Sequence, residues 1–448
     1  MKHLSAFVFL CLLSGHLQAQ DSTSYRVRLD VPVFDYPQVQ DLPYRYPSME
    51  QALSYSKGAY DLAFWGIQGL GEKLFPQADN KNSSLWGKRV FTYGLGLAFA
   101  KYGSELPIPL GVWGHEEFHR SALGVGGLHS ENGNWLFSRW DGTVYGVSDG
   151  QLADLKENNL SALLYSYISG VQYEVALNEV LSTENTFYNR TQYQEPLLAY
   201  NALYVYNYFR FSTSAASDSV KVIAPPHESA DDSERDFAGA DLTAWAYDMF
   251  QPELPYDNRT PFPDGEGVNR RVGFSDLPEN AQDYLEQQKR LSLLNFINPG
   301  IFFMPRFRVS ENFAFSFFTQ YVPTAFGNAV SLHVPLVYRG YRVSAAVFRY
   351  AGYQAEGMGL KLGMERYSIS DKLQASVWLQ GWSQPQEFFA DKTKAGGSLR
   401  FRVDYRLNAN WSTYVQARGK TQGWEMGSPY LQSNVSALVG VALALQNK

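Results

Sequence analysis

Residues 398–406 read Ser-Leu-Arg-Phe-Arg-Val-Asp-Tyr-Arg, with an apolar side chain at every second position. A period of two places the apolar side chains on one face of a β-strand and the polar side chains on the other. Residues 372–380, Lys-Leu-Gln-Ala-Ser-Val-Trp-Leu-Gln, alternate in the same way. These stretches predict two-faced strands in the last third of the chain.

The alternation continues through much of 299–448, and it predicts an antiparallel β-barrel of about eight to ten strands. Further examples are 330–338, 341–350, 411–418 and 435–445. One continuous apolar face, with arginines on the other face and aromatic residues near the strand ends, is what a closed sheet in lipid requires. The region resembles the outer-membrane β-barrels of diderm bacteria, which implies membrane lipid as a partner.

Two features leave an alternative to the membrane barrel open. The chain ends Leu445-Gln446-Asn447-Lys448, without the terminal aromatic residue typical of outer-membrane barrels. A soluble antiparallel sheet, with its apolar face packed on the helical part of the chain, would produce the same alternation. In that case the protein would be periplasmic or secreted.

The N-terminus and the composition predict an exported protein. Residues 1–19 have the charged start, apolar run and small residue near the end that are typical of a signal peptide, and the sole cysteine, Cys11, lies within them. Removal of this segment excludes disulfides and thiol catalysis. The net charge of −6 gives no basic surface, so we expect no nucleic-acid partner. The expected location is the outer membrane of a diderm bacterium.

The expected fold class is α+β, with a mostly helical region before the barrel. Apolar residues with helical spacing occupy 49–74, 91–102, 109–123, 160–181 and 196–209. The predicted organisation is a signal peptide at 1–19, a helical catalytic region at 20–211, an irregular linker region with a short helix at 212–298, and the barrel at 299–448.

The segment Gly111-Val-Trp-Gly-His-Glu-Glu-Phe-His-Arg120 contains the pattern H-E-x-x-H. Two histidines four residues apart lie one turn apart on the same face of a helix, so His115 and His119 can bind one tetrahedral metal ion. Glu116 is then the candidate catalytic residue, because it can take a proton from a water molecule that the metal activates.

A hydrolytic zinc site needs a third protein ligand, for which Glu174 is the first candidate. A helix over 160–181 places Glu174 on its apolar face, where a carboxylate is costly unless it is paired or binds a metal. Gly170, one turn earlier, allows close approach of the motif helix. Glu179 and His129 are alternates, and an ion pair between Glu174 and a basic residue is the alternative without a metal.

The motif resembles that of the H-E-x-x-H zinc metallopeptidases, in particular the gluzincins. The resemblance implies a zincin-like helical region, Zn2+ as cofactor, and a peptide or protein substrate. In gluzincins the third ligand often begins a Glu-x-x-x-Asp pattern whose Asp supports a zinc-binding His, but here that position is Asn178. Support for the zinc-binding His then comes from elsewhere, with Asp241 and Asp248 as candidates, or the assignment of Glu174 is wrong.

We therefore expect an enzyme: a membrane-associated zinc metallopeptidase that hydrolyses peptide bonds with metal-activated water. The alternative is an outer-membrane β-barrel channel or structural protein, in which the helices form a plug or binding module and any metal is not catalytic. The same motif also serves hydrolysis of other bonds, since activating water does not select a substrate. The sequence does not determine an oligomeric state.

Overall fold

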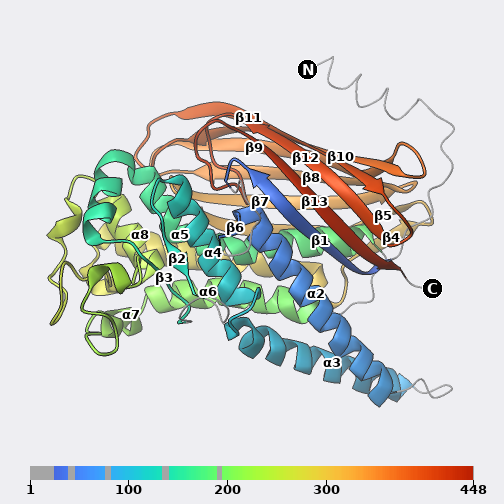
Figure 1. Ribbon diagram of the computed structural model, residues 1–448, viewed down its shortest axis with the longest axis horizontal. Helices are drawn as coiled ribbons and strands as arrows, with labels where there is room; N and C mark the ends of the chain where they lie inside the picture. Colours follow the sequence, from blue (N-terminus) through green and yellow to red (C-terminus); the bar gives the residue numbers. More distant parts are fainter. Residues whose placement is uncertain (1–24, 39–45, 76–81, 134–140, 189–193, 447–448) are drawn as a thin grey trace.

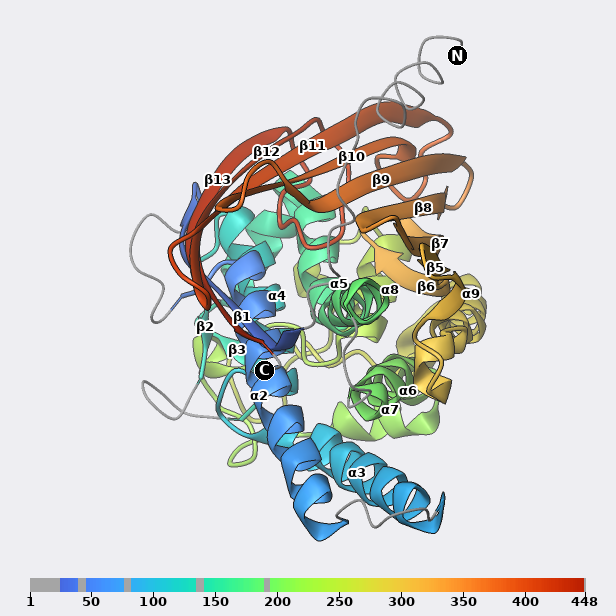
Figure 2. The same cartoon turned by 90° about the vertical axis from the view of Figure 1, so that its right-hand side faces the viewer.

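A computed structural model describes residues 25–38, 46–75, 82–133, 141–188 and 194–446. The predicted signal peptide, 1–19, lies outside these residues. The described chain forms a broad sheet on one side of a layer of helices (Figure 1). Seen from its end in Figure 2, the sheet curves around the long helix α5 (Asp149–Phe187).

The helices predicted from apolar spacing are confirmed, and most extend beyond the predicted ends. The other helices are α2 (Met49–Leu74), α3 (Asn82–Tyr102), α4 (Gly111–Val125), α6 (Glu195–Ser212), α7 (Ala215–Val220), α8 (Asp241–Phe250) and α9 (Glu279–Ser292). Short 3-10 helices are η1 (Gly103–Glu105), η2 (Asp232–Glu234), η3 (Tyr256–Asn258), η4 (Phe274–Asp276), η5 (Leu293–Phe296) and η6 (Pro299–Phe302).

Helix α5 begins with a capping box and is interrupted once. Ser148 accepts a hydrogen bond from the backbone N–H of Gln151, whose side chain accepts one from the backbone N–H of Ser148. At Asn159 the backbone leaves the helical region, with φ −157° and ψ 65°. Its side-chain oxygen accepts from the N–H of Ala162 at 3.2 Å and caps the second part of the helix. None of the described helices is both long and apolar enough to cross a membrane.

The strands after η6 form a single large antiparallel sheet. They are β4 (Phe307–Ser310), β5 (Phe313–Phe315), β6 (Phe318–Thr324), β7 (Gly327–Tyr338), β8 (Tyr341–Ala351), β9 (Glu356–Ser368), β10 (Leu373–Pro385), β11 (Thr393–Arg406), β12 (Trp411–Lys420) and β13 (Asn434–Gln446). A small separate sheet pairs β2 (Glu131–Asn132) with β3 (Val144–Tyr145).

The sheet differs from the predicted barrel of about eight to ten strands because it includes an N-terminal strand and does not close. Strand β1 (Tyr25–Tyr36) pairs with β13, which brings the number of strands to 11. The order is β1-β13-β12-β11-β10-β9-β8-β7-β5-β4, with β6 also on β7. Within the described residues, β1 and β4 are the two ends of this order and do not pair with each other.

The apolar face of the sheet points away from the helices. On adjacent positions of β10 and β11, Leu379 and Leu399 point outward and are 54% and 52% exposed, while Gln380 and Ser398 point inward and are buried. On β10 and β11 the polar face therefore covers the helices, whereas β6 and β8 also contribute apolar side chains, such as Tyr321 and Phe348, to the core that they share with the helices. The soluble alternative stays a prediction. The outer face is the large exposed apolar surface that marks a membrane or a partner.

Ion pairs and a shared apolar core join the inner face of the sheet to the helices. Arg28 of β1 pairs with Asp404 of β11 at 3.2 Å, and Arg402 pairs with Asp30 at 2.7 Å. At the C-terminal end of α5, Phe187 and Tyr188 share an apolar cluster with residues of β7 and β13. Helix α5 is thus held against two strands that lie far apart in the sheet order.

The segment predicted as a linker, 212–298, contributes a buried helix. Helix α8 lies within it, and Leu242, Trp245 and Ala246 of that helix are completely buried in the main apolar core. The short helix predicted within this segment is present as α9. The division of the chain into domains stays a prediction, although β1 and α8 tie its parts together.

Candidate metal centre

The H-E-x-x-H motif lies on α4, which packs closely on α5. The ring centroids of His115 and His119 are 4.9 Å apart on one face of α4. Two glycines permit the approach of the helices: a Cβ on Gly114 would overlap the ring of Tyr173, and a Cβ on Gly170 would overlap the Nε2 atoms of both histidines. The backbone of α5 therefore lies directly beside the two nitrogens.

Asp241 faces the same two nitrogens. Its Oδ2 atom lies 3.6 Å from Nε2 of His115 and 3.3 Å from Nε2 of His119. Ligands bound tetrahedrally at about 2.0–2.1 Å from zinc are about 3.3–3.4 Å from one another, so this spacing suits a shared ion. Asp241 is the first residue of α8, where the helix dipole favours a carboxylate.

The other ring nitrogens have hydrogen-bond acceptors. Nδ1 of His115 lies 3.1 Å from Oε1 of Glu174, and Nδ1 of His119 lies 2.5 Å from the backbone carbonyl of Ser166. When Nδ1 donates to these oxygens, the lone pair of each neutral ring is on Nε2. Such contacts are the usual support of metal-binding histidines, and here they direct both lone pairs toward Asp241.

The structure therefore exchanges the positions expected for Glu174 and Asp241. Glu174, the predicted third ligand, reaches the Nδ1 side of His115 because it lies one turn beyond Gly170 on α5. Asp241, considered in the sequence only as support for a histidine, lies on the Nε2 side. The geometry favours His115, His119 and Asp241 as the ligand set.

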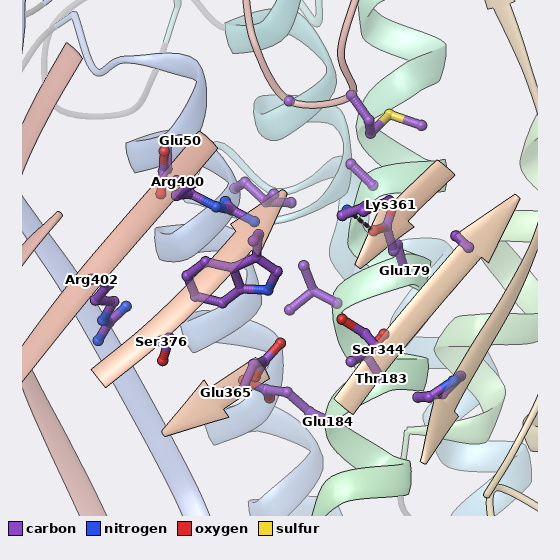
Figure 3. A pocket seen from close by; sticks show the side chains of 18 of the residues that line it. Glu50, Glu179, Thr183, Glu184, Ser344, Lys361, Glu365, Ser376, Arg400 and Arg402 are labelled. Carbon is purple, nitrogen blue, oxygen red and sulfur yellow. Dashed lines mark hydrogen bonds and ion pairs between the residues drawn. The ribbon is translucent and has the colours of Figure 1, made fainter. Parts of the chain in front are cut away.

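The two alternates lie elsewhere. Glu179 points into a cavity of about 220 Å³ between α2, α5 and the sheet, where its carboxylate pairs with Lys361 at 2.6 Å (Figure 3). His129 is exposed and stacks edge-on against Tyr46, with 5.1 Å between the ring centroids. The structure brings neither residue to His115 and His119.

A row of tyrosines on α6 completes one side of the centre. The hydroxyl of Tyr208 donates a hydrogen bond to Oδ2 of Asp241, and the rings of Tyr204 and Tyr208 contact His115 edge-on, at 5.8 and 5.9 Å between centroids. The sequence analysis did not select them. Their spacing of four residues, which also includes Tyr200, is the signal that indicates a shared helix face.

The motif contains two adjacent glutamates with different environments. Glu117 is completely buried, accepts a hydrogen bond from Arg120, and accepts another from Asn132 at 2.9 Å, which gives it a structural role. Glu116 is 9% exposed. Burial raises the pKa of Glu116 well above its ordinary value, with further increases from Asp236 and Asp241, although the charge of His115 opposes them.

The carboxylates and imidazoles shift one another's pKa values. Burial lowers the pKa of His115, but Glu174 and the hydrogen bonds to Asp241 and Glu174 outweigh it and raise that pKa well above its ordinary value. Burial raises the pKa of Asp241, but His119 and His115 outweigh it and lower that pKa well below its ordinary value. Burial raises the pKa of Glu174, against the charge of His115. A cation that binds here replaces protons.

Comparisons with known proteins add little. No protein-family model matches the chain, and no curated protein sequence matches it significantly. Among solved structures, the chain is similar to one titled "NanC porin structure in rhombohedral crystal form", with 12% sequence identity and a TM-score of 0.25. The similar part covers 31% of this chain and 76% of the porin chain. A TM-score of this size does not establish a shared fold.

Proposed function

We propose that this chain is a membrane-associated, zinc-dependent metallopeptidase that hydrolyses peptide bonds. One observation carries the proposal: the Nε2 atoms of His115 and His119 face the carboxylate of Asp241 while both Nδ1 atoms have acceptors. Two imidazoles and a carboxylate are donors that zinc prefers, and they leave a fourth position for water or substrate. A side chain at position 170 would overlap both Nε2 atoms, and glycine avoids this overlap.

Each side chain of the centre has a distinct part in the proposed chemistry. When bound, zinc would act as a Lewis acid, which would polarise the scissile carbonyl and lower the pKa of water. Glu174 and the carbonyl of Ser166 hold the imidazoles in the productive tautomer. Tyr208 fixes the direction of the Asp241 carboxylate by its hydrogen bond. Glu116 accepts the proton of the attacking water and delivers it to the leaving amine.

The surface of the sheet supports a location in the outer membrane. Outward side chains from β7 to β13 are largely apolar, while the inward face contains the ion pairs. This arrangement is typical of transmembrane β-sheets and reverses that of soluble ones. Helix α5 occupies the space that would be the lumen of a barrel (Figure 2).

A second candidate function follows from the burial of the centre. His115 is 3% exposed and His119 is 1% exposed, so a substrate reaches them only if the surrounding helices move. In this candidate, the chain is an outer-membrane channel or structural protein, the helices form a plug or binding module, and the metal is not catalytic. The ion pair between Lys361 and Glu179 would then hold the plug against the sheet.

The substitution Glu116→Gln separates these two candidates. We expect the variant to bind zinc as the wild type does, because Glu116 is not in the ligand set, and to lose roughly 10²–10⁴-fold in hydrolysis of a quenched-fluorescence peptide library. Glu311→Gln, in the exposed β4–β5 turn, is the matched control and keeps full activity. Equal hydrolysis by Glu116→Gln and the control would contradict the metallopeptidase proposal.

A further inference from the structure

A second, larger cavity lies where the longest connections of the sheet meet the helices. At this end, called here the long-loop end, residues 386–392 join β10 to β11 and residues 421–433 join β12 to β13. The cavity has a volume of about 880 Å³, which is within the range of ligand sites. Residues from five segments line it: 153–164 of α5, 249–257, 325–326, 385–389 and 422–432.

One wall of the cavity is fixed by hydrogen bonds across the molecule. The backbone N–H of Trp424 donates to Gln384 of β10 at 2.8 Å, and its indole N–H donates to Gln172 of α5 at 3.2 Å. Gln172 in turn donates to the carbonyl of Pro323 at 2.8 Å. The connection 421–433 is therefore held in place, and the site exists before a ligand binds.

The floor of the cavity is aromatic. Phe388 contacts Phe250 and Phe389, both with 4.9 Å between ring centroids, and it is buried, whereas Phe389 is 38% exposed at the opening. Phe326 and Trp424 line the cavity as well. Such a floor accepts a large apolar side chain, and its ring faces also attract cations.

The charged side chains at the cavity are nearly all acidic. The exposed carboxylates are those of Glu157, Glu253, Asp257 and Glu387. The basic residue that lines the cavity, Lys156, is buried and pairs with Asp248 at 2.9 Å, so it does not neutralise them. The opening therefore favours a cationic ligand and repels an anionic one.

We propose that this cavity binds a peptide segment in which lysine or arginine residues flank a large apolar side chain. The apolar side chain occupies the aromatic floor formed by Phe388, and the basic side chains meet the carboxylates at the opening. The proposal that this peptide is a substrate rests on the proposed metallopeptidase function. The proposal that the cavity binds the peptide does not.

Helix α8 connects the cavity to the metal centre. Its first residue is Asp241, and Met249 near its other end lines the cavity. At about 1.5 Å per residue the two are about 12 Å apart along the helix. In outer-membrane barrels the longer loops face outward, so in the proposed membrane location the cavity receives peptides from outside the cell.

The test uses the full chain in detergent micelles and a fluorescein-labelled, end-capped peptide, Lys-Lys-Phe-Leu-Lys-Lys, with binding measured by fluorescence anisotropy. We expect saturable binding that weakens as salt is added. The double substitution Glu253→Gln, Glu387→Gln should weaken it about tenfold, because rim charges are removed. Phe389→Ser should also weaken it. Glu311→Gln, at the opposite end of the sheet, should leave it unchanged.

The proposal would be overturned by equal binding of the twin peptide in which Glu replaces Lys, or by equal effects of the rim and control substitutions. Displacement of the peptide by calcium or spermidine at equal concentration would also overturn it, since the site would then recognise charge alone. If Glu116→Gln binds the peptide but the wild type does not cleave it, the result would contradict the metallopeptidase function and support peptide binding in the cavity. If the wild type cleaves other peptides but does not bind this one, the result would support the metallopeptidase function and contradict peptide binding in the cavity.

Discussion

His115 contacts a carboxylate at each of its two ring nitrogens, and the two carboxylates have different chemical roles. Glu174 lies beside Nδ1 of His115. Asp241 lies beside Nε2 of His115 and also beside Nε2 of His119. Helical spacing predicted that Glu174 would approach the motif, because it determines which face of α5 is apolar. The spacing could not predict which ring nitrogen of His115 Glu174 would contact, because that depends on how closely α4 and α5 pack at Gly170.

The exchange of roles leads to a prediction about zinc affinity. Asp241→Ala should abolish stoichiometric zinc binding, because it removes a ligand. Glu174→Gln should retain zinc with an affinity roughly 10–100-fold lower, because it only weakens the support of His115. Competition with a fluorescent zinc chelator measures both. Loss of zinc in Glu174→Gln together with normal affinity in Asp241→Ala would return the ligand assignment to Glu174.

Glu195, at the start of α6, gives a prediction about stability and pH. It is buried, and burial raises its pKa from 4.5 to about 7, although a backbone hydrogen bond and Arg89 oppose the shift. Because the folded state binds the proton more tightly than the unfolded state, the contribution of Glu195 to stability falls as the pH rises from 4.5 through 7. This loss amounts to about 3 kcal/mol.

Glu195→Gln removes this titration and should therefore be more stable than the wild type at pH 8. The two should be nearly equally stable at pH 4.5. Differential scanning calorimetry in micelles at both pH values measures the difference. The same melting-temperature difference at both values would show that the charge of Glu195 is not the cause.

At the scale of elements, α5 determines where the metal centre lies. It contributes Gly170, Glu174 and the carbonyl of Ser166, and α4 packs against it. Its length and apolar spacing made its main part predictable. The capping box at Ser148 and the re-capped break at Asn159 allow it to begin earlier than the predicted 160–181.

The close packing of α5 against α4 can be tested by adding one methyl group at Gly170. In Gly170→Ala the new Cβ overlaps both Nε2 atoms, so zinc binding should be lost while the helical circular dichroism is retained. Gly66→Ala is the control, because a Cβ there has open space and Ala is the better helix former by about 1 kcal/mol. Normal zinc binding by Gly170→Ala would mean that α4 and α5 are farther apart than described.

The sequence analysis did not predict strand β1 or helix α8, for different physical reasons. The alternation Val27, Leu29, Val31 with Arg28 and Asp30 is present in β1, so its strand character could be predicted, but its pairing with β13 joins the two ends of the chain. Helix α8 lies in a segment of short apolar and polar runs between prolines and glycines, where periodicity is weak. Asp241 was therefore considered only as possible support for a histidine.

At the scale of the whole molecule, a membrane location is favoured by the sheet, whose apolar face points outward and whose charged face points toward the helices. Strand periodicity predicted two faces, but it could not determine which face would meet the helices. The charged inner face is stabilised because its groups pair with one another, as in Arg402 with Asp30 and Lys361 with Glu179. The apolar outer face has no such covering among the described residues.

A charge on the outer face should therefore be costly in lipid. Leu379 lies at the middle of β10, and Leu379→Arg should lower the free energy of unfolding of the vesicle-inserted protein by roughly 2–4 kcal/mol. Urea titration in phospholipid vesicles measures the change, and Glu311→Arg in a turn is the control. Unchanged stability, or a wild type that stays monomeric without detergent, would contradict the membrane location.

The most direct test of the metal centre is zinc K-edge X-ray absorption of the purified full-length protein. We expect a single zinc ion per chain, with a first shell of nitrogen and oxygen at about 2.0–2.1 Å and scattering from two imidazole rings. The signal should disappear in Asp241→Ala. Protein that stays free of metal in excess zinc, or zinc surrounded only by water oxygens, would contradict the account.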